Sequence, residues 1–167
     1  MKNIILVGFM GVGKGTVARA LAKESNLFAI DTDDLIESLE NRKIKDIFAK
    51  EGEEHFRKLE KKCALWLQKN VKNSIISTGG GFYKQKNIKK IGKIVYLKSS
   101  FEAILQRLQN HPNAVKKLSK RPLFKDLKKA KELYKQRVKE YEKLSDITIT
   151  VENKDLKQIT NEILSKV

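Results

Sequence analysis

The feature that most constrains this chain is the stretch Gly8–Thr16, with the sequence GFMGVGKGT. It follows an apolar run at residues 4–7 and precedes apolar residues at helical spacing over 17–22. A strand, a glycine-rich turn and a helix in this order, with the spacing G-x-x-x-x-G-K, are typical of a phosphate-binding loop. Gly11 and Gly13 can adopt positive φ, so that backbone N–H groups can surround an anion at the positive end of the helix. We therefore predict a nucleotide site here, rather than a flexible turn that only closes a βα unit.

The other residues of the stretch indicate how it would hold ATP. Lys14 brings a mobile positive charge to the β and γ phosphates. Gly15 departs from the usual pattern, in which Ser or Thr gives its hydroxyl to Mg²⁺, and a hydroxyl follows only at Thr16. The residues expected to bind ATP in this loop are Gly11, Val12, Gly13, Lys14, Gly15 and Thr16.

Length and composition indicate one domain without a membrane span. The 167 residues suit a single domain, here 1–167, that can bury a substantial core. No apolar run is long enough to cross a membrane, and we see no signal peptide before the first strand. Cys63 is the only cysteine, so an internal disulfide is excluded, as is usual in a reducing cytoplasm. We expect a cytoplasmic monomer.

The net charge of +16 could indicate nucleic-acid binding. However, the excess is almost entirely lysine spread over every predicted helix, and aromatic residues are not interleaved with it as a stacking platform would need. We interpret the lysines as a solvated surface that helps attract anionic substrates, and expect no specific nucleic acid. Arginine is scarce, and a retained Arg hints at bidentate anion contact; the six are Arg19, Arg42, Arg57, Arg107, Arg121 and Arg137.

Apolar patterns predict alternating strands and helices. The strands are expected at 3–7, 27–30, 74–77, 94–97 and 147–151. The helices are expected at 14–24, around 35–39, from 44 to a stop near Gly52, at 53–71, around 101–108, at 127–144 and around 156–163. Because the strands are mostly continuous apolar runs, we predict a parallel five-stranded sheet covered on both faces, a three-layer αβα fold. Cys63 and Trp66 are expected in its core, and residues 111–125 as a mobile surface segment.

Three segments that follow strands directly should meet at the carboxyl edge of this sheet: 8–14, 31–33 and 78–81. Asp31 and Asp33 alternate, so both can point into the site, where a carboxylate can hold Mg²⁺ or accept a proton from an attacking hydroxyl. The other interpretation of an Asp at this point is the N-cap of the next helix, a part that Asp34 can play.

Two further elements complete the expected site. Gly79, Gly80 and Gly81 offer backbone N–H groups without side-chain bulk, which suits a small polar ligand. Arg121, in the mobile basic segment, can close over the transferred phosphoryl group and stabilise its charge.

With these residues in place, the chain resembles shikimate kinases, within the nucleoside-monophosphate-kinase-like group of P-loop proteins. The resemblance covers the whole chain and implies a P-loop kinase fold with an acceptor-binding segment at about 32–62 and a lid at about 110–125. The motifs that carry it are GFMGVGKGT, Asp31-Thr32-Asp33, Phe56-Arg57 with Glu60, Ser77-Thr78-Gly79-Gly80-Gly81, Arg121-Pro122-Leu123, and Arg137 followed by Tyr141.

The resemblance implies ATP-dependent phosphorylation of the 3-hydroxyl of shikimate, with Mg²⁺, in aromatic amino-acid biosynthesis. It implies that Asp33 grips the ring hydroxyls and accepts the proton, and that Arg57 and Arg137 clamp the carboxylate. It further implies that Gly79 to Gly81 line the pocket of shikimate and that Asp31 organises Mg²⁺ and its waters. Arg121 would contact the phosphates, and Arg107 would lie near the adenine.

The sequence departs from the family at Gly15, where shikimate kinases usually have Ser on the metal. We therefore expect Mg²⁺ to have no direct loop-hydroxyl ligand, or to take Thr16. The segment 111–119 is also slightly long for the lid of the family. The alternatives are another small-molecule kinase of this group, for gluconate or a nucleotide, and a basic P-loop ATPase that binds nucleic acid.

Overall fold

The computed structural model describes residues 2–119 and 122–167, with the side chain of Pro122 left aside, and contains one five-stranded sheet. The strands are β1 (Asn3–Val7), β2 (Phe28–Asp31), β3 (Ser74–Ser77), β4 (Gly92–Lys98) and β5 (Ile147–Thr150). They lie in the order β2-β3-β1-β4-β5, and every neighbouring pair is parallel. The predicted parallel sheet and its five strands are therefore confirmed.

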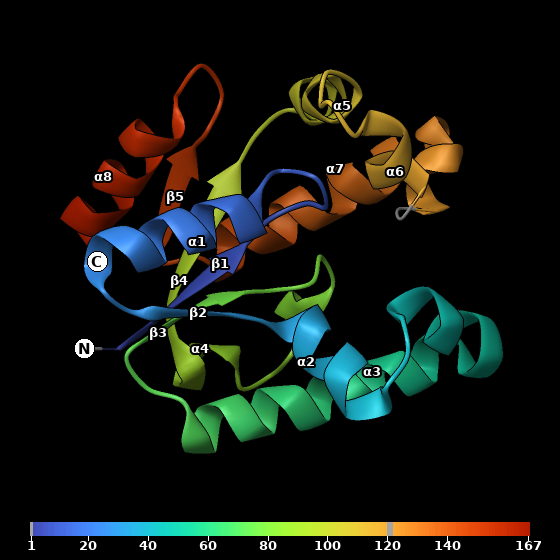
Figure 1. Cartoon of the computed structure of the whole chain (residues 1–167), viewed down its shortest axis with the longest axis horizontal. Coiled ribbons are helices and arrows are strands. Elements are labelled where there is room, and N and C mark those ends of the chain that lie inside the picture. Colours follow the sequence, from blue (N-terminus) through green and yellow to red (C-terminus); the bar gives the residue numbers. More distant parts are fainter. Residues whose placement is uncertain (1, 120–121) are drawn as a thin grey trace.

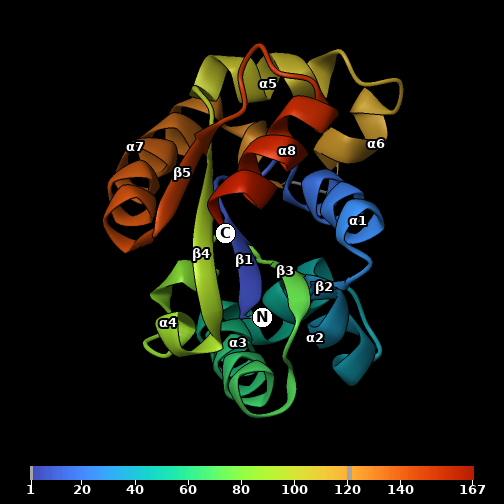
Figure 2. The same ribbon diagram turned by 90° about the vertical axis from the view of Figure 1, so that its left-hand side faces the viewer.

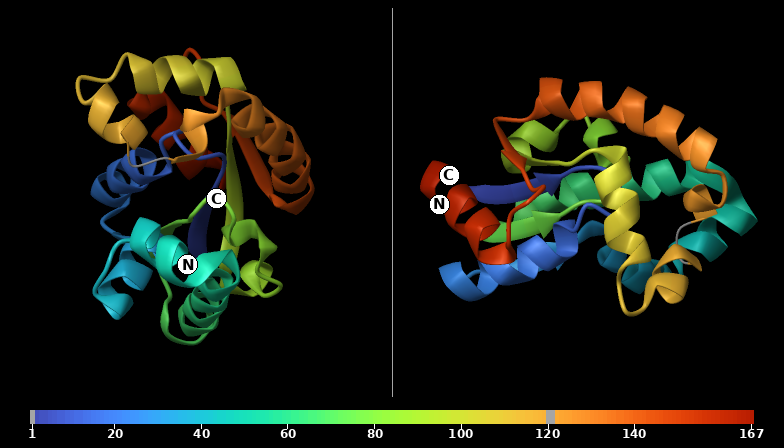
Figure 3. Two further views of the ribbon diagram at one scale, coloured as in Figure 1. Left: turned by 90° about the vertical axis from the view of Figure 1, so that its right-hand side faces the viewer. Right: turned by 90° about the horizontal axis from the view of Figure 1, so that it is seen from above.

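Helices cover both faces of this sheet, as predicted. Figure 2 shows α1 (Lys14–Ser25) and α8 (Leu156–Lys166) side by side on one face, with α4 (Ile88–Ile91) and α7 (Leu127–Leu144) on the other. The view from above in Figure 3 shows the same layers, with α7 and α1 on opposite sides of the strands. The central strand β1 is buried along its whole length, which explains its unbroken apolar sequence.

The carboxyl ends of the strands lie between two groups of helices (Figure 1). On one side are α5 (Phe101–Gln109) and α6 (Ala114–Ser119), and on the other are α2 (Thr32–Glu40) and α3 (Ile44–Asn70). Two short 3-10 helices are also present, η1 (Phe82–Lys84), which follows the glycines after β3, and η2 (Pro122–Lys125). The segment predicted to be a mobile surface segment, 111–125, includes α6 and η2 where it is described.

Helix α3 is kinked where the sequence predicts a helix stop. Gly52 has φ 83° and ψ 179°, which are non-helical, and it separates two helical stretches. A positive φ of this kind favours glycine. The prediction of one helix that stops near Gly52 and another that begins at Glu53 is therefore confirmed.

The prediction for Trp66 is wrong. Cys63 is buried as predicted, but Trp66 is 46 % exposed. The buried stripe of α3 continues from Cys63 to Leu67, four residues on, which is fully buried. Each residue turns a helix by about 100°, so Trp66 lies beside this stripe and at the helix surface.

Within the described residues, no helix is long and apolar enough to cross a membrane.

Candidate active site

The glycine-rich turn between β1 and α1 has the backbone expected of a phosphate-binding loop. Gly11 has φ 85° and Gly13 has φ 105°, both in the region that favours glycine. Gly13 is the N-cap of α1, and no side chain makes a capping hydrogen bond there. The positive end of α1 is therefore available to an anion, as the sequence predicts.

Lys14 is buried in the loop that it follows. Its Nζ donates to the carbonyl oxygens of Gly8, at 2.6 Å, and Phe9, at 3.2 Å. Its charge also acts on Asp33, whose pKa it lowers against the larger effects that raise it. The ammonium group therefore lies against the loop and within electrostatic range of Asp33.

The three consecutive glycines after β3 each face one predicted acceptor residue. A Cβ atom added at Gly79 would lie 2.7 Å from Oδ1 of Asp33, and one at Gly80 would lie 2.8 Å from Nη1 of Arg137. At Gly81 it would overlap the guanidinium of Arg57, with Cζ at 2.7 Å. The structure therefore brings these six residues together around one turn of backbone.

Asp33 combines a buried carboxyl oxygen with a raised pKa. Its Oδ1 is buried and has no hydrogen-bond partner in the part of the chain that the structure describes. Burial, together with the negative charges of Asp31 and Glu60, raises its pKa from 3.8 to about 7. A carboxylate with this pKa can accept a proton from a substrate hydroxyl near neutral pH.

Two arginines present guanidinium groups to the same space. Arg57 donates from Nη1 to Oε2 of Glu60 at 2.7 Å and from Nη2 to Oε1 of Glu53 at 3.0 Å. Arg137 is 7 % exposed, and its Nε has no partner among the described residues. Arg57 also donates from Nε to Oε1 of Glu53 at 3.3 Å, so each of its nitrogens has a partner, whereas Arg137 has an unpaired donor. A planar guanidinium with an unpaired donor suits a carboxylate ligand.

Sequence reasoning assigned no role to Glu60, which is fully buried. Burial raises its pKa, although Arg57 beside it acts in the opposite direction. Its Oε1 has no partner within the described residues. The sequence marks Glu60 as part of the motif with Phe56 and Arg57, and places it one helical turn after Arg57 on the same face of α3.

Asp31 caps α2, a part that the sequence analysis considered for Asp34. Oδ1 of Asp31 accepts from the backbone N–H groups of Asp33, at 2.9 Å, and Asp34, at 3.3 Å. Assigning the cap to Asp34 is therefore wrong. Asp31 is the last residue of β2, so its extended backbone lets the side chain turn back over the first helical turn.

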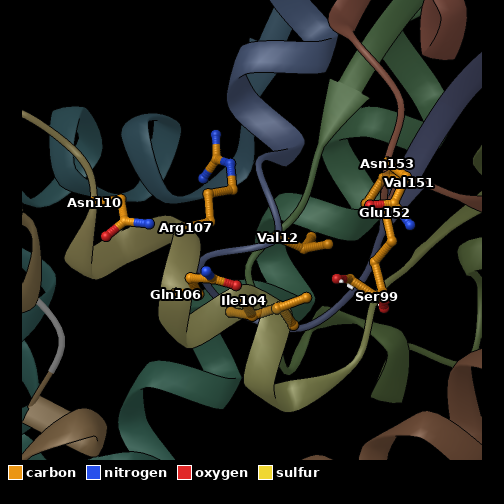
Figure 4. Close-up of a pocket in the computed structure, with 10 residues that line it drawn as sticks. Val12, Ser99, Ile104, Gln106, Arg107, Asn110, Val151, Glu152 and Asn153 are labelled. Carbon is orange, nitrogen blue, oxygen red and sulfur yellow. Dashed lines mark hydrogen bonds between the residues drawn. The ribbon is translucent and has the colours of Figure 1, made fainter.

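A cavity of about 410 Å³ lies beside the phosphate-binding loop (Figure 4). Arg107 lines this cavity and donates from Nη1 to the carbonyl oxygen of Gly11 at 3.0 Å. Sequence reasoning missed Ser99 and Glu152, which also line it and hydrogen-bond to each other at 3.3 Å. Their only sequence signal is that they follow the ends of β4 and β5.

Arg121, the arginine predicted to contact the phosphates, lies outside the described residues.

Comparison with known proteins agrees with this geometry. The family model described as shikimate kinase matches residues 10–167. A shikimate kinase of Sulfurihydrogenibium is 42 % identical over 100 % of this chain and 98 % of its own, and one of Helicobacter hepaticus is 42 % identical over 89 % and 86 %. The solved shikimate kinase of Acinetobacter baumannii, in complex with shikimate, has a TM-score of 0.86 at 32 % identity, over 99 % of this chain and 92 % of that one. The chain therefore belongs to the shikimate kinase family, the kinases that use ATP to phosphorylate shikimate in aromatic amino-acid biosynthesis.

Proposed function

We propose that the six residues around the glycine turn form the shikimate site, and that the 3-hydroxyl of shikimate attacks the γ phosphorus of ATP. One observation carries this assignment: a Cβ atom added at Gly79, Gly80 or Gly81 would overlap the side chain of Asp33, Arg137 or Arg57, respectively. A side chain on any of the glycines would occupy the space where a small ligand meets both a carboxylate and two guanidinium groups.

In this mechanism Asp33 accepts the proton of the attacking hydroxyl as the new O–P bond forms and the bond to ADP breaks. Arg57 and Arg137 clamp the carboxylate of shikimate and so orient the ring. Lys14 and the N–H groups at the start of α1 bind the phosphates and stabilise the charge that spreads over the transferred group. We assign to Arg121, as the lid arginine, a further contact with that group.

The adenosine part of ATP is assigned to the cavity beside the loop, with Arg107 near the base. For Mg²⁺ the residues present are a reasonable fit. Oδ1 of Asp31 is used by the helix cap, which leaves its second oxygen, and Thr16 lies in the first turn of α1. Together with phosphate oxygens and water these are the hard oxygen ligands that Mg²⁺ prefers. When bound, Mg²⁺ would neutralise charge on the phosphates.

Gly15→Ser is expected to leave kcat intact and to lower the Mg²⁺ concentration that gives half-maximal rate. A Cβ at Gly15 would meet only Nη1 of Arg19, at 3.4 Å, so the side chain fits, and its hydroxyl adds a metal ligand. A Mg²⁺ titration of the rate measures this. A variant that loses activity at every Mg²⁺ concentration would contradict the proposed metal environment.

Arg57→Lys is expected to raise KM for shikimate about 10-fold or more, with little change in KM for ATP, because one ammonium cannot replace a planar fork. Initial rates at varied shikimate and varied ATP measure both constants. Arg42→Lys is the matched control, since Arg42 also binds two glutamates, Glu40 and Glu51, but outside the proposed pocket. Near-normal KM for shikimate in Arg57→Lys would mean that the acceptor site is misassigned.

Substrate choice is tested by ATP-dependent ADP release with shikimate, gluconate, AMP and CMP. We expect turnover with shikimate alone, whereas ADP release only with AMP would favour a nucleotide kinase.

For the nucleic-acid alternative, an oligonucleotide titration at physiological salt should show no length-dependent, tight binding and no stimulated ATP turnover. We propose a cytoplasmic monomer that acts on small molecules.

A further inference from the structure

Two tyrosines of α7 bind backbone carbonyls on opposite sides of the proposed active site. The hydroxyl of Tyr141 donates to the carbonyl oxygen of Gly80 at 2.6 Å, and that of Tyr134 donates to the carbonyl oxygen of Ser99, also at 2.6 Å. Gly80 belongs to the glycine turn after β3, and Ser99 lines the cavity after β4. One helix therefore touches both the shikimate side and the ATP side of the site.

The spacing of the two tyrosines places them on one face of α7. They are seven residues, or two helical turns, apart, and Arg137 lies between them on the same face. Arg137 reaches Gly80, the residue whose carbonyl Tyr141 holds. The glycine turn is thus contacted by α7 through a guanidinium that faces the ligand space and through a hydroxyl that holds the backbone.

Both rings are fixed by other aromatic side chains. The ring of Tyr141 lies 5.3 Å from that of Tyr83 and 5.2 Å from that of Tyr96, between ring centroids. The ring of Tyr134 lies 5.3 Å from Phe9 of the phosphate-binding loop. Burial raises the pKa of both hydroxyl groups, so each keeps the proton that it donates. Each hydroxyl is a rigidly held donor.

We propose that Tyr141 and Tyr134 are positioning residues that set the backbone of the shikimate pocket and of the ATP pocket, respectively. This inference rests on the proposed assignment of the two pockets. In a trans peptide the C=O and the next N–H point to opposite sides, so holding the carbonyl of Gly80 also fixes the direction of the N–H of Gly81. Tyr134 fixes in the same way the N–H of Ser100, which binds Glu152 at the cavity.

The test is a crossed pair of conservative variants, each of which removes one hydroxyl from α7. Tyr141→Phe is expected to raise KM for shikimate about 5- to 10-fold and to leave KM for ATP within about 2-fold. Tyr134→Phe is expected to raise KM for ATP by a similar factor and to leave KM for shikimate unchanged. Each variant loses one hydrogen bond of 2.6 Å from a tyrosine hydroxyl to a carbonyl oxygen, and Tyr141→Phe also loses the contact of its hydroxyl with the guanidinium of Arg137. A purely structural role would lower Tm in both variants and move the two constants together.

Two results would overturn the inference: both constants unchanged in both variants, or both constants shifted alike in both. Arg57→Lys, assayed in parallel, separates this failure from failure of the proposed site. If Arg57→Lys raises KM for shikimate but Tyr141→Phe does not, the shikimate site stands and only the positioning role is lost. If neither raises it, the acceptor pocket itself is misassigned.

Discussion

Asp33→Asn is expected to lower kcat by about 10²- to 10⁴-fold, with the fold retained. The carboxylate is the only proton acceptor that faces the glycine turn among Asp33, Arg57 and Arg137, and an amide cannot take the proton of the attacking hydroxyl. ADP release at saturating shikimate and ATP measures the loss. Asp34→Asn, on the exposed side of α2, is the matched control that should keep its activity. A kcat for Asp33→Asn within a few-fold of the unchanged protein would exclude Asp33 as the acceptor.

The pKa of Asp33 also predicts how the unchanged enzyme responds to pH. Because the ionised carboxylate accepts the proton, kcat/KM for shikimate should rise as pH increases through about 7 and then level off. The residual activity of Asp33→Asn should lack this step. A step that persists in the variant would assign it to another group.

The same shift links Asp33 to stability. Its pKa is 3.8 without the folded environment and about 7 in the folded protein, so between these values the folded state holds a proton that the unfolded state has lost. Stability must therefore fall as pH rises from about 4 to 7, by up to about 4 kcal/mol from this group. Asp33→Asn removes this loss of stability, because an amide does not ionise between about pH 4 and 7. In the absence of substrates it should have a higher Tm than the unchanged protein at pH 8, and a similar Tm at pH 4.

Much of the fold could be predicted because the information is local. Continuous apolar runs predict buried parallel strands, and the glycines of the phosphate-binding loop are needed for positive φ that other residues avoid. Since the carboxyl ends of parallel strands share one edge, the meeting of the loop with Asp33 and the glycine turn could also be predicted. Trp66 was misplaced because periodicity gives the spacing of a stripe but not its width.

The parts of the site that sequence reasoning missed depend on contacts between distant residues. Tyr141 and Gly80 are 61 positions apart, and Tyr134 and Ser99 are 35 apart. The motif of Arg137 followed by Tyr141 marks this tyrosine in the sequence, but an aromatic side chain at helical spacing gives no sign of what its hydroxyl binds. Asp31 shows the converse case: two neighbouring carboxylates can each cap α2, and only the backbone geometry decides which one does.

Gly81→Ala is expected to raise KM for shikimate by about 10²-fold while leaving KM for ATP nearly unchanged. Gly81 has φ −100°, so the methyl group adds no backbone strain. It would instead overlap the guanidinium of Arg57, the far end of a flexible side chain that can move away. The cost should therefore fall mainly on shikimate binding, because the guanidinium loses its position. A smaller loss of Tm is expected as well, since the displaced guanidinium moves away from the buried carboxyl group of Glu60.

A double variant, Gly81→Ala with Arg57→Lys, tests whether Gly81→Ala acts through Arg57. If Gly81→Ala acts by displacing Arg57, then Gly81→Ala with Arg57→Lys should be little worse than the more damaging single change, since both affect the same contact with the shikimate carboxylate. Fully additive effects would mean that the methyl group blocks the ligand directly. Gly52→Ala provides the reverse control: its φ of 83° disfavours a side chain, but a Cβ there meets nothing within 4 Å. It should lower Tm without the large rise in KM, because strain in α3 leaves the space between Gly81 and Arg57 unfilled.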